Sequence, residues 1–178
     1  MKSKLLLPLQ FLFIIWAIFL LDMFLINISF CKYGILPRNV NGLIGIITST
    51  FLHANLAHII SNSILLVFLL YISIVFFNKE TKSAIILIIF ISGSLVWLFG
   101  RQGYHVGASS LIYGLTGFLT FFGIFKKSIV PIVIGIFVGL TYGTTMIMGL
   151  LPIFQSVSWE GHLFGGIAGV ISAKMLSK

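Results

Sequence analysis

The stretch His53-Ala-Asn-Leu-Ala-His58-Ile-Ile-Ser-Asn62 places two histidines and an asparagine at the start of an apolar run that extends to Phe77. Two further polar clusters stand at the start of later apolar runs, Gly107-Ala108-Ser109-Ser110 and Glu160-Gly161-His162-Leu-Phe-Gly165-Gly166. Such polar groups are unfavourable inside a membrane unless they bond one another or do chemistry. A serine and a histidine on separate spans, at one membrane depth, suggest a nucleophile and its base.

The composition is that of an integral membrane protein. Of the 178 residues 59% are hydrophobic and only 8% are charged, and the mean hydropathy is +1.18. A soluble core does not need so much apolar sequence. No stretch is long or polar enough for a separate soluble domain, so residues 1–178 are predicted to form a single domain. The single Cys31 excludes an internal disulfide.

Apolar runs of roughly 17–25 residues indicate helical spans. The sequence predicts six of them, at Leu9–Ile28, Ala57–Phe77, Ser83–Phe99, Ser109–Phe125, Ile129–Leu151 and Gly161–Leu176. The long loop from Phe30 to about Leu56 carries enough apolar residues to be partly embedded. The predicted fold is therefore an all-α membrane protein, a compact six-transmembrane-helix bundle with a partly embedded first outer loop.

The charges predict the orientation. With a cytoplasmic N-terminus, the inner segments hold eight of the eleven basic residues and the outer loops hold Lys32, Arg38 and Arg101. This positive-inside bias puts both termini in the cytoplasm and the three polar clusters near the outer face. We expect a multi-pass protein of the plasma (inner) membrane. The basic residues are scattered and form no face for a phosphate backbone, so nucleic acid is not an expected partner.

Ser109 is the candidate nucleophile. It begins a predicted helix after the small residues Gly107 and Ala108, and unpaired N–H groups at a helix N-terminus can hold a developing oxyanion. The alternative is that Ser109 only caps this helix, and taken alone the residue favours that alternative.

His162 is the candidate general base. Gly165 and Gly169 form a small-residue face that would let the last span approach the span containing Gly114 and Gly117. Such packing would bring His162 within hydrogen-bond reach of Ser109.

Other polar residues carry weaker signals. His58 and Asn62 are four residues apart on one helix face, which suits either an oxyanion hole or a structural polar network. His105 is expected to support the turn before Ser109, and Glu160 is too close to His162 to act as a triad acid. No pattern typical of a metal site is present, so no metal and no cofactor are expected.

These residues resemble the motifs of the rhomboid intramembrane serine proteases. The pattern of His53, His58 and Asn62, the Gly-x-Ser motif at Ser109 and the Gly-His-x-x-Gly motif at His162 match in order and spacing. The likeness covers most of the chain. It implies a rhomboid-like bundle that cleaves peptide bonds in or near transmembrane segments of other membrane proteins, with the lipid bilayer as its surroundings.

The resemblance also implies roles for individual residues. Ser109 and His162 would form the catalytic dyad, and His58 and Asn62 would form the oxyanion hole with a backbone N–H near Ser109. Tyr113 would pack on the His162 ring, and Gly107 and His53 would support the site. Ser110 departs from the family pattern, which usually has a glycine there, and the Trp-Arg pair of the first loop is absent.

Two other functions are also compatible with the sequence. A catalytically inactive rhomboid-like relative would bind membrane-protein clients through the same cavity. A small channel or transporter would need charged residues along a pore, and only Asp22 lies clearly within a predicted span.

Overall fold

The computed structural model describes residues 2–24, 29–151 and 157–178, and over these ranges it is built from helices without a β-strand. The predicted all-α bundle is thereby confirmed. The helices are α1 (Lys2–Phe24), α2 (Gly45–Thr48), α3 (Leu56–Phe99), α4 (Ser109–Lys126), α5 (Ile129–Gly149) and α6 (Trp159–Leu176), with short 3₁₀ turns at Phe30–Tyr33, Val40–Gly42 and Ser49–Phe51. The end of the first predicted span, residues 25–28, lies outside the described residues.

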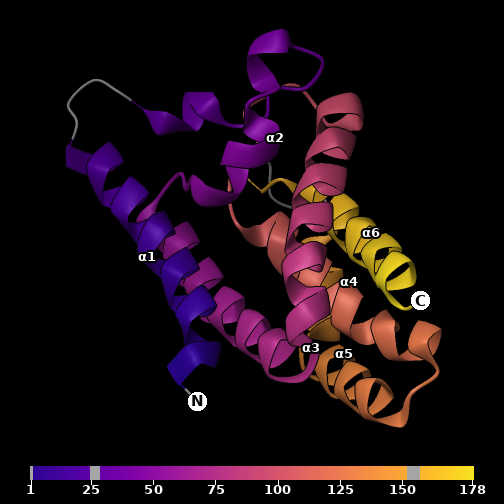
Figure 1. Ribbon diagram of the computed structural model, residues 1–178. Helices are drawn as coiled ribbons and strands as arrows, with labels where there is room; N and C mark the ends of the chain where they lie inside the picture. The colour runs from indigo at the N-terminus through magenta and orange to yellow at the C-terminus, as the bar shows by residue number, and fades with distance from the viewer. Residues whose placement is uncertain (1, 25–28, 152–156) are drawn as a thin grey trace.

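Helix α3 holds the second and third predicted spans, Ala57–Phe77 and Ser83–Phe99, as two helical arms. Its 44 residues are broken by a kink at Phe77, where the backbone is not helical (φ −138°, ψ 47°). The two arms of the bend are visible in Figure 1. Inside the bend, Thr81 Oγ1 donates to the Phe77 carbonyl at 2.7 Å and lies 2.7 Å from Ser73 Oγ. These hydroxyls provide hydrogen-bond partners next to the break in the helix.

Three described helices, α1, α3 and α4, are long and apolar enough to cross a membrane. A 44-residue helix measures about 66 Å, roughly twice the hydrocarbon thickness, so α3 has the length for two crossings. The chain is thus a helical integral membrane protein. The number of spans stays a prediction.

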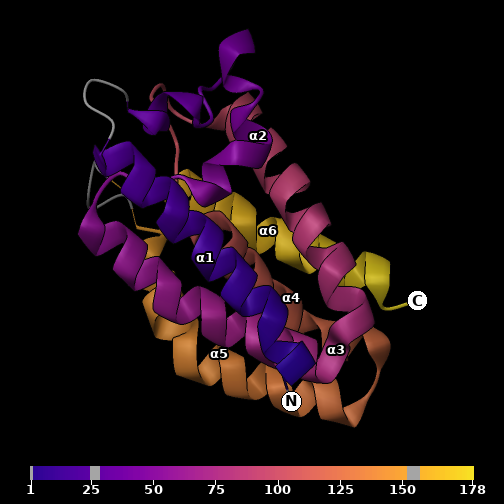
Figure 2. The ribbon, with the colours of Figure 1, turned by 60° about the vertical axis from the view of Figure 1, so that its left-hand side comes forward.

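Helix α4 forms the centre of the bundle. It packs against α3, α5 and α6, whereas α1 lies outside and packs on α3 (Figure 2). Leu111, Leu115, Phe118 and Phe122 are fully buried. Because α4 is enclosed by its neighbours, the position of its first residue, Ser109, is set by several elements at once.

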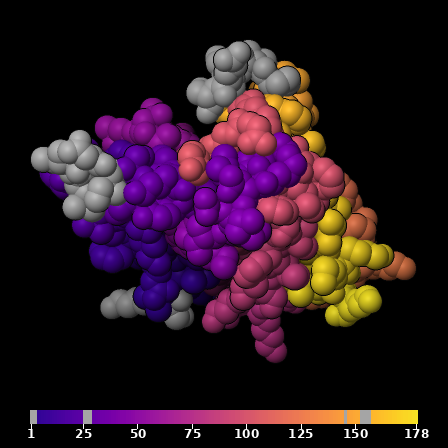
Figure 3. All heavy atoms as spheres, turned by 90° about the horizontal axis from the view of Figure 1, so that it is seen from above, coloured from indigo at the N-terminus to yellow at the C-terminus, as the bar shows by residue number. Residues whose placement is uncertain are grey.

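The first loop covers one end of the bundle, beside the segment that precedes α4 (Figure 3). Ile35 and His105 exchange two backbone hydrogen bonds, of 3.0 and 2.9 Å, which join these two segments. The loop also exposes Val40, Ile44 and Ile47. These apolar side chains fit the prediction that the loop is partly embedded, which remains a prediction.

Candidate active site

Ser109 is the first residue of α4, directly after a turn that requires glycine. Gly107 has a φ of +121°, a conformation that L side chains rarely adopt. Ala108 is the N-cap and has no side chain that can cap the helix. The first N–H groups of α4 are therefore not satisfied by a side-chain cap, as an oxyanion site at a helix N-terminus would need.

The Gly107 turn also brings the other polar cluster close. A Cβ built on Gly107 would lie 2.6 Å from two ring atoms of His58 and 3.4 Å from the Asn62 amide nitrogen. Glycine is thus needed for space as well as for its backbone conformation. Helix α3 begins at Leu56 because Asn55 caps it: the Asn55 side chain accepts a hydrogen bond from the His58 N–H at 2.9 Å. The structure brings His58 and Asn62 to the turn that carries Ser109.

His53 holds this part of the site together. Its Nε2 lies 3.1 Å from the Asn62 amide nitrogen and accepts from the Ala108 N–H at 3.4 Å. Since both neighbours are donors, we assign Nε2 as the unprotonated nitrogen. Burial, together with the nearby His58, lowers the pKa of His53 to about 4. His53 therefore stays neutral near pH 7 and keeps this acceptor.

His162 is oriented by a backbone carbonyl. Its Nδ1 lies 2.7 Å from the Gly149 oxygen at the end of α5, and a carbonyl can only accept, so Nδ1 carries the proton. Nε2 is then the basic nitrogen. The ring stacks on Tyr113 with centroids 4.2 Å apart and planes 5° apart, and the Tyr113 hydroxyl donates to the Met146 carbonyl at 3.1 Å. The expected stacking of Tyr113 on His162 is present.

Close packing between α4 and α6 fixes the height of His162 relative to Ser109. A Cβ on Gly165 would collide with the Ser110 carbonyl, and one on Gly169 with the Gly114 carbonyl. The sequence prediction that this glycine face packs on α4 is confirmed. The two helices approach so closely because neither glycine carries a side chain at the contact.

The four polar residues of the predicted site share one cavity. It has a volume of about 780 Å³ and its wall includes His58, Asn62, Ser109 and His162. Within the described residues, no hydrogen bond joins Ser109 Oγ to His162. The predicted bond is therefore not formed in this conformation, although both side chains face the same space. Catalytic hydrogen bonds are often long before substrate binds.

Glu160 and His105 connect the loop before α4 to the start of α6. The buried Glu160 carboxylate accepts from the Arg101 N–H at 3.3 Å and pairs with Arg101 Nε at 3.6 Å. His105 Nε2 lies 2.9 Å from the Arg101 carbonyl, and its Nδ1 lies 2.6 Å from the hydroxyl of Ser158, which caps α6. Both links join the loop before α4 to the start of α6.

The sequence did not predict the role of Gly149, whose carbonyl orients His162. Every residue has a backbone carbonyl, so only the choice of glycine at this position could have indicated the contact. A Cβ at Gly149 would collide with the Tyr113 hydroxyl and lie 3.2 Å from His162 Nδ1. A glycine at the end of a predicted span was therefore the available signal.

Residues 40–178 match the Rhomboid domain family. This chain belongs to the rhomboid family. It is also similar to an uncharacterized protein of Mycobacterium tuberculosis (strain ATCC 25618 / H37Rv), with 37% identity over 153 residues that cover 81% of this chain and 63% of that protein. An uncharacterized protein of Mycobacterium leprae (strain TN) is 35% identical over 179 residues, covering 95% of this chain and 70% of its own length. The rhomboid chain described here thus spans less than two thirds of the tuberculosis relative.

Proposed function

We propose that this rhomboid protein is an intramembrane serine endopeptidase that cleaves transmembrane proteins in or near their membrane spans. The observation that carries the proposal is the orientation of His162. Its Nδ1–H is held by the Gly149 carbonyl, and its Nε2 is left as a base in a protein that places Ser109 on the same cavity wall. A carbonyl here does what the acidic residue of a catalytic triad does, because it selects the tautomer.

The reaction would proceed in two steps. Ser109 Oγ attacks the scissile carbonyl carbon, its proton moves to His162 Nε2, and the carbonyl oxygen becomes an oxyanion. Collapse of this intermediate breaks the C–N bond, and the proton passes from His162 to the leaving amine. Water then attacks the acyl ester, with His162 again as base, and releases Ser109.

The oxyanion would be held by groups that meet at the Gly107 turn. Asn62 uses one amide hydrogen to reach His53, which leaves its second hydrogen for the substrate. The His58 ring borders Gly107, and the N-terminus of α4 supplies backbone N–H groups. Donors fixed before the reaction stabilise the developing charge without reorganisation.

Two cavities meet at His162 and suit a substrate that is part apolar and part hydrated. The 780 Å³ cavity has polar walls and would admit the water needed for deacylation. A second cavity of about 520 Å³ lies between α4, α5 and α6, has almost wholly apolar walls, and also borders Tyr113 and His162. An apolar segment of a membrane protein would fit there.

A fluorophosphonate probe tests the proposal directly. We expect the purified wild-type protein to be labelled in detergent, and Ser109→Ala to remain unlabelled. Ser109→Ala and His162→Ala should each abolish cleavage of a transmembrane test substrate in proteoliposomes, and the double variant should be no worse than either, because the two residues act as a unit. Equal cleavage by wild type and Ser109→Ala would end the protease proposal. Client binding without labelling or cleavage would instead support an inactive rhomboid-like protein.

A further inference from the structure

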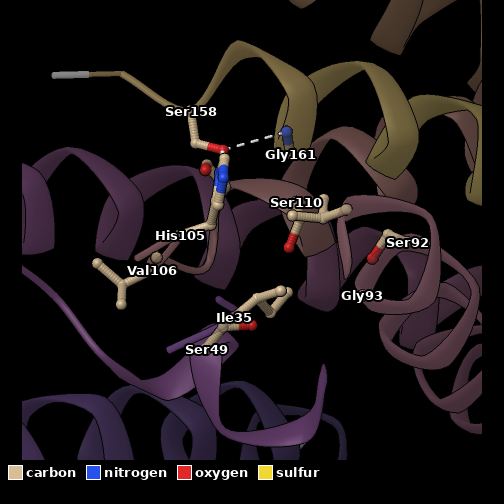
Figure 4. Close-up of a pocket in the computed structure, with 12 residues that line it drawn as sticks. Ile35, Ser49, Ser92, Gly93, His105, Val106, Ser110, Ser158 and Gly161 are labelled. Atoms are coloured by element: carbon tan, nitrogen blue, oxygen red, sulfur yellow. Dashed lines mark hydrogen bonds between the residues drawn. The ribbon is translucent and has the colours of Figure 1, made fainter. Parts of the chain in front are cut away.

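The start of α6 borders a different cavity on each side. Figure 4 shows the small one, of about 20 Å³, where the Ser158 hydroxyl accepts a hydrogen bond from the Gly161 N–H at 3.2 Å. The opposite face of α6 borders the apolar cavity of about 520 Å³. The small cavity has no room for a larger molecule, so a ligand at this helix would bind on the apolar side.

The larger cavity is a groove between α5 and α6, which we call the α5–α6 groove, and α4 forms its floor. In the described residues α5 and α6 each pack on α4 and touch one another little. A Cβ built on Gly143 of α5 or on Gly166 of α6 would meet nothing within 4 Å. The exposed side chains of Ile147 and Ile167 also line the groove. The groove is therefore open along the outside of the bundle.

A groove of this kind does not stay empty in a membrane. Helices α5 and α6 are predicted spans, so the groove faces lipid hydrocarbon. Its walls expose almost no polar surface that could hold water. An empty groove would also forfeit the dispersion contacts of its lining. A lipid hydrocarbon chain is therefore the occupant whose chemistry fits when no substrate is bound.

Lys174 stands at the inner end of the α5–α6 groove. Helical spacing places it on the face of α6 that carries Ile167 and Val170, which line the groove. The Lys174 Nζ lies 5.0 Å from the centroid of the Phe125 ring. Phe125 stacks in turn on Phe121, which also lines the groove. A positive charge thus lies beside the inner end of an apolar groove.

The acidic side chains of the protein leave Lys174 without a carboxylate partner. The sequence has only three acidic residues, and in the described structure each has another partner: Glu80 pairs with Lys126, Glu160 with Arg101, and Asp22 with the Phe30 N–H. Lys174 is also exposed. The positive-inside bias puts it at the cytoplasmic surface, where anionic lipid headgroups lie.

We propose that the α5–α6 groove binds one anionic phospholipid of the inner leaflet, with an acyl chain in the groove and the phosphate at Lys174. The lengths agree. The 12 residues from Lys174 to His162 span about 18 Å along α6, close to the depth of about 15 Å that one leaflet of hydrocarbon has. The end of the chain reaches Tyr113 and His162, which line the same groove.

The bound chain occupies the space proposed above for an apolar segment of a substrate. Lipid and substrate therefore compete for the α5–α6 groove, and a substrate has to displace the chain before its peptide bond reaches His162. This competition rests on the proposed protease function, whereas the lipid site itself does not.

Photo-crosslinking tests the position of the chain. The protein is reconstituted in phosphatidylcholine vesicles that contain phosphatidylglycerol with a diazirine near the end of one acyl chain. We expect crosslinks at Tyr113 and Met146, which line the groove and are shielded from the surrounding lipid. Gly143→Leu should lower these crosslinks severalfold, because its side chain enters the groove. Leu140→Phe is the matched control, since Leu140 of α5 is 80% exposed and does not line the groove.

Two outcomes would overturn the groove as a lipid site. One is that Tyr113 and Met146 stay unlabelled in the wild type, as they would if a second copy of the chain covered the groove. The other is that their crosslinks persist unchanged in Gly143→Leu.

The headgroup is tested by comparing this probe with a phosphatidylcholine probe that carries the same chain. In the wild type we expect the anionic probe to label the groove about fivefold more, since one lysine near the surface contributes about that factor. The two probes should label Lys174→Gln equally. Lys126→Gln removes the same charge from a lysine that pairs with Glu80, and it should keep the preference. Equal labelling by both probes in the wild type, or equal loss in both variants, would overturn the role of Lys174.

Kinetics in vesicles test the competition. With phosphatidylglycerol present, Lys174→Gln should lower KM for a transmembrane substrate severalfold and leave kcat unchanged, because its lipid competitor binds more weakly. In vesicles of phosphatidylcholine alone the two proteins should have the same KM. An unchanged KM in both kinds of vesicle would overturn the competition. The crosslinking is repeated on Ser109→Ala, so it decides the lipid site even if the wild type cleaves nothing and the protease proposal fails.

Discussion

The Nδ1 atom of His162 lies 2.7 Å from the carbonyl oxygen of Gly149, and this bond joins the end of α5 to the first turn of α6. Tyr113 lies against both residues, because its ring stacks on His162 and its hydroxyl occupies the space where a Gly149 side chain would be. The orientation of the proposed base therefore depends on a glycine in a different helix.

Gly149→Ala should strongly lower the cleavage rate, because the new methyl group would displace the Tyr113 hydroxyl and disturb His162. We expect Tyr113→Phe alone to have a small effect, since the stacked ring is kept and only the bond to Met146 is lost. The combination of Gly149→Ala and Tyr113→Phe should recover part of the lost kcat, since the phenylalanine makes room for the methyl group. Steady-state kinetics would measure this rescue. A double variant as inactive as Gly149→Ala alone would show that the hydroxyl is not the obstacle.

Asn62→Ala should lower kcat by about 10²–10³ and leave KM nearly unchanged, because an oxyanion donor binds most strongly in the transition state. Asn62→Asp is a useful companion, since it keeps the size of the side chain and removes the donor. A variant with normal kcat and raised KM would place Asn62 in ground-state substrate binding instead.

Acid should weaken the folded state through His53. A free histidine titrates near pH 6.5, whereas burial and His58 lower the pKa of His53 to about 4 in the folded protein. Above pH 6.5 the residue is neutral in both states. Below it the unfolded chain takes up the proton first, so the free energy of unfolding falls until about pH 4, by roughly 3 kcal/mol in total.

Unfolding measurements at several pH values, on wild type and His53→Gln, would check this contribution. Glutamine does not titrate and can still offer an acceptor to Asn62. The free energy of unfolding of His53→Gln should therefore change less between pH 6.5 and pH 4 than that of the wild type. Identical pH profiles for the two proteins would show that His53 is not the group responsible.

The sequence predicted the helices and the polar clusters because both are local patterns. A long apolar run predicts a buried or membrane-spanning helix without any knowledge of its neighbours in the fold. His58, Ser109 and His162 each stand at the start of such a run. The second predicted span ends at Phe77, where the structure has its kink, but the residues between the two predicted spans, 78–82, are helical. A helix end at an aqueous surface can carry charged side chains, so polarity alone does not end a helix there.

Other features depend on groups without a sequence signature. The Gly149 carbonyl and the Ala108 N–H are backbone groups that tertiary packing brings to His162 and to His53. His53 also lies against the Asn62 side-chain amide, which is nine residues away in the sequence. Likewise, Arg38 donates to the Leu98 and Gly100 carbonyls at the end of α3, where the sequence showed only a departure from the family's first loop.

The proposed orientation can be tested with the natural cysteine. Cys31 lies in the first loop, which the positive-inside argument puts at the outer face. Burial raises the pKa of its thiol, so a membrane-impermeant maleimide should react slowly at neutral pH and faster at mildly alkaline pH. Cells that make Cys31→Ser with Ser128→Cys, at the turn between α4 and α5, should be labelled only after the membrane is opened. Labelling of the Ser128→Cys variant in intact cells would show that the orientation is opposite to the one proposed.

Gly107 and Gly103 provide a matched pair that separates backbone strain from contact with the site. Both have positive φ, +121° and +136°, so alanine at either position is strained, at a cost of about 1–3 kcal/mol. A Cβ at Gly103 meets nothing within 4 Å, whereas one at Gly107 would lie 2.6 Å from the His58 ring. We therefore expect the two alanine variants to lose similar thermal stability, and only Gly107→Ala to lose most of its kcat. If Gly103→Ala lost as much activity, strain in the loop rather than displacement of His58 would be the cause.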